Sequence, residues 1–136
     1  MKKFIFIFSH KPTELQIEDA KNRFNVKEII IIPDKLVKEI WSKIPSDLDS
    51  VEHYIEPVKK WLKSISQKDD IVLIQGDFGA TYMMIQFCFK NELIPVYSTT
   101  ERTVIENHNK DGKVDLIHSF KHNKYRCYEK IKKSHS

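Results

Sequence analysis

Three short apolar runs, each followed by a pattern typical of a helix, constrain the fold of this chain most strongly. The runs cover residues 4–8, 29–32 and 71–74. The third run reads IVLI and contains no polar residue, which is typical of a central strand buried on both faces of a parallel sheet. Because these runs alternate with helical patterns, the sequence predicts a mostly parallel sheet with right-handed crossovers.

Two of the predicted helices begin at recognisable residues. Thr13-x-x-Gln16 is a capping-box pattern, and it predicts a helix that continues to about Phe24. Pro33 follows the second apolar run and can open a helix that reaches Trp41, because proline is tolerated at the first helical position. Both patterns place a helix directly after a predicted strand.

Two further helices differ in how their apolar residues are distributed. Apolar residues recur at three- and four-residue spacing over 51–65, and Pro57 places the stable part of this helix after Glu56. The helix that follows the third run extends to Lys90 and is apolar nearly all round. Such a helix must bury a second side away from its own sheet. We therefore expect a homodimer through this helix, across a two-fold axis.

The last part of the chain predicts one more parallel strand and a hairpin. The strand covers residues 93–97 and ends in the polar segment 98–102. Residues 103–107 and 114–120 flank a Lys-Asp-Gly-Lys turn, which is a β-hairpin signal. The expected fold class is α/β, a single Rossmann-like domain over residues 1–136. Its mostly parallel sheet is flanked by helices and is followed by a C-terminal β-hairpin.

Composition excludes several classes of protein. With 40% hydrophobic residues the chain can build a core, and its longest apolar runs are far shorter than a bilayer span. Cys88 and Cys127 lack metal-ligand spacing, so we expect free thiols and no zinc site. The sequence therefore predicts a cytoplasmic protein without a metal, a cofactor or a membrane partner.

Positive charge is concentrated near the C terminus. Lys and Arg number 14 against 14 Asp and Glu in residues 1–100, but 9 against 5 in residues 101–136. This excess favours a polyanionic ligand. A solvated basic tail over residues 130–135 explains part of it equally well.

Small, polar and charged residues follow the predicted strands at their carboxyl ends, where ligands of such sheets bind. The candidates for catalysis are His10, Lys11, Arg102 and His122, and the candidates for ligand binding are Ser9, Gly76, Asp77, Phe78, Gly79, Ala80, Thr81, Thr99, Thr100 and Lys121. The sequence places each of them in a turn or loop after a strand.

The turn from Gly76 to Thr81 is the most informative of these loops. Its glycines let the backbone approach a ligand, and the amino end of the following helix favours an anion. The turn matches neither a Walker A loop nor the dinucleotide fingerprint Gly-x-Gly-x-x-Gly. Asp77 can contact a ribose hydroxyl or an exocyclic amine, or it can cap the helix, and both interpretations stay open.

Histidine and the neighbouring cations suggest chemistry on a phosphate. His10 is the candidate acid or base because imidazole titrates near neutral pH, although a lone loop histidine is more often a surface residue. Lys11 would stabilise negative charge beside it. Arg102 can bind a phosphate or pair with Glu101. The residues that can either stack bases or cover an edge of the sheet are Tyr125, Arg126 and Tyr128.

Five segments of the chain resemble a small CRISPR-associated family of stand-alone proteins encoded beside type III CRISPR systems. They are Phe-Ser-His-Lys at 8–11, Trp-Ser-Lys-Ile-Pro at 41–45, Gln-Gly-Asp-Phe-Gly-Ala-Thr-Tyr at 75–82, Tyr-Ser-Thr-Thr-Glu-Arg at 97–102 and Phe-Lys-His at 120–122. The resemblance spans nearly the whole chain, and the run at 75–82 is its most specific part.

The resemblance implies a CARF-like fold, a homodimer and a ring nuclease activity that degrades cyclic tetra-adenylate, the messenger that activates CRISPR effector nucleases. Cleavage would need no metal, because the ribose 2′-hydroxyl attacks the adjacent phosphate and leaves a linear product with a 2′,3′-cyclic phosphate. The roles we expect are acid or base for His10, charge stabilisation for Lys11 and Arg102, ribose or base contacts for Asp77 and Thr81, and a second cationic wall for Lys121 and His122.

Two other functions fit the same loops. A non-catalytic sensor or sponge would bind the same messenger without an acid or base. An enzyme that acts on a mononucleotide or a phosphorylated metabolite would have a monomeric site and no preference for cyclic RNA. DNA is not an expected partner in any of these cases.

Overall fold

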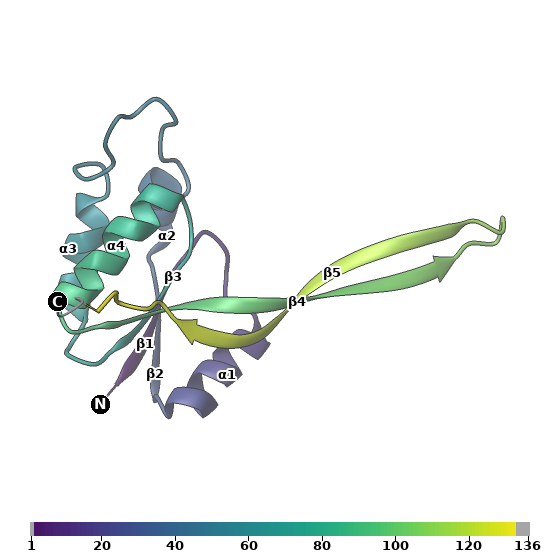
Figure 1. Ribbon diagram of the computed structural model, residues 1–136, viewed down its shortest axis with the longest axis horizontal. Coiled ribbons are helices and arrows are strands. Elements are labelled where there is room, and N and C mark those ends of the chain that lie inside the picture. Colours follow the sequence, from purple (N-terminus) through teal and green to yellow (C-terminus); the bar gives the residue numbers. More distant parts are fainter. Residues whose placement is uncertain (1, 133–136) are drawn as a thin grey trace.

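Five strands form one sheet with helices on both faces, in a computed structural model that describes residues 2–132 (Figure 1). In chain order the elements are β1 (Lys3–Ile7), α1 (Glu14–Phe24), β2 (Glu28–Ile31), α2 (Asp34–Leu36), the π-helical turn η1 (Val37–Trp41), α3 (Glu56–Ile65), β3 (Ile71–Ile74), α4 (Phe78–Lys90), β4 (Ile94–His108) and β5 (Val114–Cys127). The strand order is β2-β1-β3-β4-β5, and only β5 runs antiparallel to its neighbour. The predicted fold class is confirmed. Half of the predicted basic tail, residues 133–135, lies outside the described residues.

Strand β1 separates the two layers of the core. Phe4 and Phe6 pack with residues of α1, whereas Ile5 and Ile7 pack with residues of α3 and α4. All four residues of β3 are at most 1% exposed, so the prediction of a central strand buried on both faces is confirmed. Figure 1 shows α1 on one side of the sheet and α2, α3 and α4 on the other.

Local signals fix where the helices begin. Thr13 Oγ1 accepts a hydrogen bond from Gln16 N at 3.2 Å and Gln16 Oε1 accepts one from Thr13 N at 2.9 Å, so the predicted capping box is confirmed. Pro57 lies in the first turn of α3, as predicted. The helix expected after Pro33 divides into α2 and η1, and η1 ends on the buried Trp41. No helix in the described part of the chain is long and apolar enough to cross a membrane.

A buried carboxylate joins the beginnings of β1 and β3. Asp70 has no exposed surface. Its Oδ1 accepts a hydrogen bond from Lys3 N at 2.9 Å, and its Oδ2 accepts one from Gln67 N at 2.7 Å. Lys3 Nζ lies 3.8 Å from the same carboxylate. Asp70 therefore accepts hydrogen bonds from one backbone N–H group in β1 and one in the loop before β3.

Strand β4 is much longer than the sequence predicts. The prediction that residues 98–102 form a loop is wrong, because β4 continues to His108 and pairs with β5 throughout, apart from an irregularity between Ser98 and Thr100. A two-stranded ribbon with both faces in solvent does not need apolar alternation, so its polar residues look like a loop in the sequence. The predicted hairpin is confirmed, and Gly112 in its turn has a φ of +77°.

The two cysteines lie in different environments. Both are free, with Cys88 buried and Cys127 exposed. Burial raises the pKa of Cys88 from 9.0 to about 12. The Cys88 thiol is therefore protonated at neutral pH, and it packs into the core from the buried face of α4 as a small apolar group.

Candidate functional site

A hollow lies at the switch point of the sheet, where β1 has β2 on one side and β3 on the other. Its volume is about 230 Å³, and its lining is formed by Phe8, Ser9, His10, Gln75 and Gly76. These residues directly follow β1 and β3, and ligands of doubly wound sheets bind at this point. The structure therefore brings together Ser9, His10 and Gly76, which the sequence singled out.

Two further hollows adjoin this one along the carboxyl edge of the sheet. The hollow toward β2 has a volume of about 290 Å³, shares Ser9 and His10, and adds Lys11 and Lys38. The hollow toward β4 has a volume of about 410 Å³, shares Gln75 and Gly76, and adds Phe78, Thr81, Tyr82, Ile85, Tyr97 and Tyr128. We call the three together the edge hollows. They have cations at one end and aromatic rings at the other. Among residues 2–132, no group of three or more His, Cys, Asp and Glu side chains is placed to hold a metal ion.

Packing against Trp41 explains the glycine at position 76. A Cβ at Gly76 would lie 2.8 Å from Trp41 Nε1 and 2.9 Å from Trp41 Cε2. The indole cannot move aside easily, because it is buried and its Nε1 donates a hydrogen bond to the Gln75 carbonyl at 3.0 Å. Gly76 therefore fixes the turn after β3 against η1. A Cβ at Gly79 would meet its neighbours at 3.5 Å or more, so that position has no such requirement.

The amino end of α4 presents one unsatisfied hydroxyl and two exposed rings. Asp77 Oδ2 accepts a hydrogen bond from Ala80 N at 3.0 Å, so the helix-cap interpretation of Asp77 is confirmed, and the Ala80 side chain is buried in the core. Phe78 is 95% exposed and Tyr82 is 61% exposed. Thr81 Oγ1 is buried and has no hydrogen-bond partner among the described residues. Because an unpartnered buried hydroxyl is unfavourable, Thr81 is well placed to bind a ligand in the hollow that it lines.

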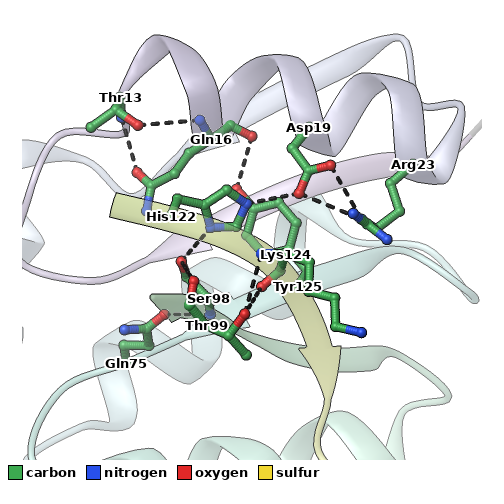
Figure 2. Close-up of polar contacts among 10 residues, drawn as sticks. All are labelled: Thr13, Gln16, Asp19, Arg23, Gln75, Ser98, Thr99, His122, Lys124 and Tyr125. Atoms are coloured by element: carbon green, nitrogen blue, oxygen red, sulfur yellow. Dashed lines mark hydrogen bonds and ion pairs between the residues drawn. The ribbon is translucent and has the colours of Figure 1, made fainter. Parts of the chain in front are cut away.

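His122 belongs to a buried polar network (Figure 2). Its Nε2 lies 2.7 Å from Asp19 Oδ2, and its Nδ1 lies 2.5 Å from Ser98 Oγ. The His122 side chain is 3% exposed, and its ring packs on Tyr125. Asp19 is also 3.2 Å from Arg23 Nε. In the neutral imidazole, the Asp19 carboxylate would hold the proton on Nε2, so that Nδ1 accepts a hydrogen bond from the Ser98 hydroxyl.

Gln75 links this network to the edge hollows. Its Oε1 accepts a hydrogen bond from Ser98 N at 2.8 Å, and it lines both the switch-point hollow and the hollow toward β4. Neither Ser98 nor His122 lines an edge hollow. The prediction that His122 follows the last strand is wrong, because it lies within β5, where its ring contacts Asp19. We assign His122 to positioning β5 against α1.

The other candidates from the last part of the chain lie within strands instead of loops. Thr99, Thr100 and Arg102 belong to β4, and Lys121 belongs to β5. Thr99 Oγ1 donates a hydrogen bond to the Lys124 carbonyl at 2.9 Å. None of these four residues lines an edge hollow. The prediction that Arg102 follows the fourth strand and Lys121 the last strand is therefore wrong, because β4 and β5 continue through these positions and extend past the carboxyl edge of the sheet.

The two C-terminal tyrosines have separate structural roles. Tyr125 is buried under α1 and donates a hydrogen bond to the Gln16 carbonyl at 2.8 Å, so it covers the sheet. Tyr128 donates one to the Ile74 carbonyl at 2.7 Å and packs on Tyr97 in the hollow toward β4. Burial raises the pKa of both tyrosines, with smaller contributions from the Asp19 charge at Tyr125 and from Tyr97 at Tyr128. Both phenols are therefore neutral at physiological pH.

Sequence reasoning missed several residues of this region, among them Gln75, Tyr97, Lys38, Tyr82 and Asp19. Gln75 and Tyr97 line the edge hollows, and a signal for both was present, since each lies at the carboxyl end of a predicted parallel strand. Asp19 had no local signal. It lies on a helix, 103 residues away from His122 in the sequence.

Comparisons with known proteins agree over nearly the whole chain. The Uncharacterized protein MJ1673 family matches residues 2–126, which include every helix and all but the last residue of β5. A relative from Methanocaldococcus jannaschii, named Uncharacterized protein MJ1673, is 46% identical over 128 residues, which are 94% of this chain and 98% of the relative. No solved structure gives a significant match. This chain belongs to the MJ1673 family.

Proposed function

We propose that the edge hollows bind cyclic tetra-adenylate and cleave it without a metal, so that the protein acts as a cytoplasmic ring nuclease in type III CRISPR defence. The observation that carries this proposal is the composition of the edge hollows, where cations, hydroxyls and exposed aromatic rings adjoin at the switch point. Two of the segments that resemble the ring nuclease family, 8–11 and 75–82, supply much of this lining. The MJ1673 family match does not bear on this activity.

The two ends of the edge hollows suit different parts of a nucleotide. Lys11 and Lys38 lie at the end toward β2, where their ammonium groups can neutralise phosphates. Phe78 and Tyr82 lie at the end toward β4, where their exposed rings can stack on adenine bases. Thr81 Oγ1 is available to a ribose or phosphate oxygen. A ligand with alternating bases and phosphates therefore finds complementary groups along one edge.

The proposed reaction uses His10 and its neighbours at the switch-point hollow. His10 takes the proton of a ribose 2′-hydroxyl, and the 2′-oxygen forms a bond to the adjacent phosphorus. The bond from that phosphorus to the 5′-oxygen breaks, and the 5′-oxygen takes a proton from water as it leaves. Lys11 stabilises the negative charge of the phosphorane, and Ser9 can donate a hydrogen bond to it. The products carry a 2′,3′-cyclic phosphate and a 5′-hydroxyl.

Base stacking gives the direct test of the binding site. We expect Phe78→Ala to weaken binding of cyclic tetra-adenylate about tenfold, because a stacked base contributes roughly 1–3 kcal/mol. Phe78 makes no contribution to the buried core, so the variant should keep its thermal stability. Calorimetric titration with a slowly cleaved phosphorothioate analogue measures the affinity. Phe120→Ala removes another exposed phenylalanine ring, on β5 and outside the edge hollows, and serves as the matched control. Equal affinities for the two variants would place the ligand elsewhere.

The proposed homodimer uses the outer side of α4. Phe78, Tyr82, Ile85 and Phe89 recur there at spacings of four, three and four residues, and Ile85 and Phe89, which follow the two rings proposed to stack on bases, would supply the helix-to-helix contact. A two-fold axis beside this stripe would bring two sets of edge hollows together. A cyclic tetranucleotide with two-fold symmetry matches such an arrangement.

The dimer is tested at the carboxyl end of the stripe, away from the edge hollows. We expect Phe89→Glu to convert the protein to a form of half the mass, because it places one charge from each subunit in an apolar contact. Light scattering should then give about the 16.2 kDa of one chain instead of twice that value. Lys60→Glu adds a negative charge to exposed α3 and should leave the mass unchanged. A wild-type protein of one-chain mass would rule out this dimer.

A further inference from the structure

Gln75 is the first residue after β3 and lines two of the edge hollows. Its backbone N–H donates a hydrogen bond to the Ile7 carbonyl at 3.1 Å, and its backbone carbonyl accepts one from Trp41 Nε1 at 3.0 Å. Its side-chain oxygen, Oε1, accepts one from Ser98 N at 2.8 Å. Within residues 2–132, the amide nitrogen Nε2 has no hydrogen-bond partner. Nε2 is therefore the polar atom of Gln75 that remains for a ligand.

Ser98 fixes the orientation of the Gln75 amide. A backbone N–H can only donate a hydrogen bond, so the atom that faces it must be Oε1 and not Nε2. The pairing of β3 with β4 ends at Leu73 and Val96, and the Gln75 oxygen is an acceptor for β4 just past these residues. Figure 2 shows Nε2 on the side of the amide away from Ser98. A donor held in this way loses little conformational freedom when it binds a ligand.

The switch-point hollow offers hydrogen-bond donors, and its lining contains no carboxylate. Ser9 contributes a hydroxyl and His10 an imidazole, while Phe8, Gln75 and Gly76 complete the lining. Its volume of about 230 Å³ is below the roughly 300–1,000 Å³ of typical ligand pockets. The hollow therefore suits one small group of a larger ligand, such as a phosphate, better than a whole nucleotide.

Positive charge lies next to this hollow. The adjoining hollow toward β2 shares Ser9 and His10, and it has two lysines, Lys11 and Lys38, against one carboxylate, Asp34. Ammonium groups neutralise a phosphate without fixing its orientation, whereas a fixed amide donor can orient one of its oxygens. The surroundings of Nε2 therefore favour an anionic acceptor over a neutral one.

We propose that Gln75 Nε2 donates a hydrogen bond to a non-bridging oxygen of a phosphate in the switch-point hollow. For the identity of the ligand this inference rests on the proposed ring nuclease function, in which the phosphate is the one that the ribose 2′-oxygen attacks. The amide then stabilises the negative charge that develops on the phosphorane. Because an amide does not titrate, it takes no part in proton transfer, which remains with His10. A phosphate of another ligand would meet the same donor.

Gln75→Glu tests this donor with the smallest change of shape. The carboxylate keeps an oxygen for Ser98 N and replaces the NH2 group with an oxygen that repels phosphate. We expect the single-turnover rate of cleavage of cyclic tetra-adenylate to fall about 100-fold or more, the usual cost of losing one such donor. Affinity for the 2′-deoxy analogue, which has no attacking hydroxyl, should fall less than the rate. Gln86→Glu makes the same change on exposed α4, outside the edge hollows, and should keep the wild-type rate.

Nuclear magnetic resonance observes the Gln75 amide group directly. The signals of its NH2 group are assigned by their absence in Gln75→Glu, and thermal melting confirms that this variant is folded. We expect these signals to shift downfield on titration with the 2′-deoxy analogue of cyclic tetra-adenylate, because the analogue keeps both non-bridging oxygens. A separate titration uses inorganic phosphate as the probe.

The outcomes separate this inference from the proposed function. A cleavage rate of Gln75→Glu within about threefold of the wild type would overturn the role of Gln75 and leave the ring nuclease function standing. A shift of the Gln75 signals by inorganic phosphate, without binding or cleavage of cyclic tetra-adenylate, would support the phosphate site and contradict the ring nuclease function. Gln75 signals that neither probe shifts would overturn the inference.

Discussion

Replacement of His10 by alanine should lower the rate of cleavage of cyclic tetra-adenylate by at least about 100-fold, the contribution typical of a positioned acid or base. His10 is exposed and lines two of the edge hollows, so its removal creates no cavity in the core. The affinity for the ligand and the melting temperature should therefore change little. Single-turnover kinetics with enzyme in excess measure the cleavage step without product release.

Two controls make the His10 result specific. His53→Ala removes another exposed histidine, in the segment before α3, and should keep the wild-type rate. Added imidazole should restore part of the activity of His10→Ala but not raise the wild-type rate, because it can enter the space that the side chain leaves. A His10→Ala variant with an unchanged rate would remove His10 from the mechanism and transfer the acid or base role to another group.

Replacement of Asp70 by alanine should lower the free energy of unfolding by about 3 kcal/mol, the largest loss of stability that we expect from one polar residue. The variant removes the acceptor of the Lys3 and Gln67 N–H groups, and it removes a carboxylate that lies 3.8 Å from the Lys3 ammonium group. Urea unfolding followed by circular dichroism measures the change. Asp49→Ala, on an exposed loop, should stay within about 0.5 kcal/mol of the wild type. A loss below about 1 kcal/mol for Asp70→Ala would show that water replaces the carboxylate.

The parallel part of the fold could be predicted from sequence because its signals are local. The IVLI run at 71–74 has to be buried on both faces, and the capping box at Thr13 and Gln16 specifies one helix start without tertiary context. The order of these elements then leaves few possible topologies. The length of the β4–β5 hairpin was not predicted, because its polar residues are compatible with a strand and with a loop. What distinguishes them is the pairing of β4 with β5, which involves residues far apart in the chain.

The position of the candidate site could be predicted, but the orientation of its side chains could not. The rule that ligands bind beyond the carboxyl ends of strands correctly brought Ser9, His10 and Gly76 together. The rule failed for Arg102, whose position depends on where β4 ends. It also failed for His122, whose position depends on a contact with Asp19 of α1. Gly76 illustrates a further limit. The Trp41 indole excludes a side chain at this position, whereas the sequence suggested that the glycine lets a ligand approach the backbone. Long-range packing, which has no signature in a single sequence, decided each of these cases.

Incubation of the purified protein with radiolabelled cyclic tetra-adenylate in excess EDTA, followed by chromatographic separation of the products, tests the central claim most directly. We expect conversion to linear adenylates that end in a 2′,3′-cyclic phosphate, at a rate that EDTA does not change. Tight binding without conversion would contradict the catalytic claim and make the protein a sensor or sponge for the messenger. The absence of both binding and conversion would contradict the proposed function altogether.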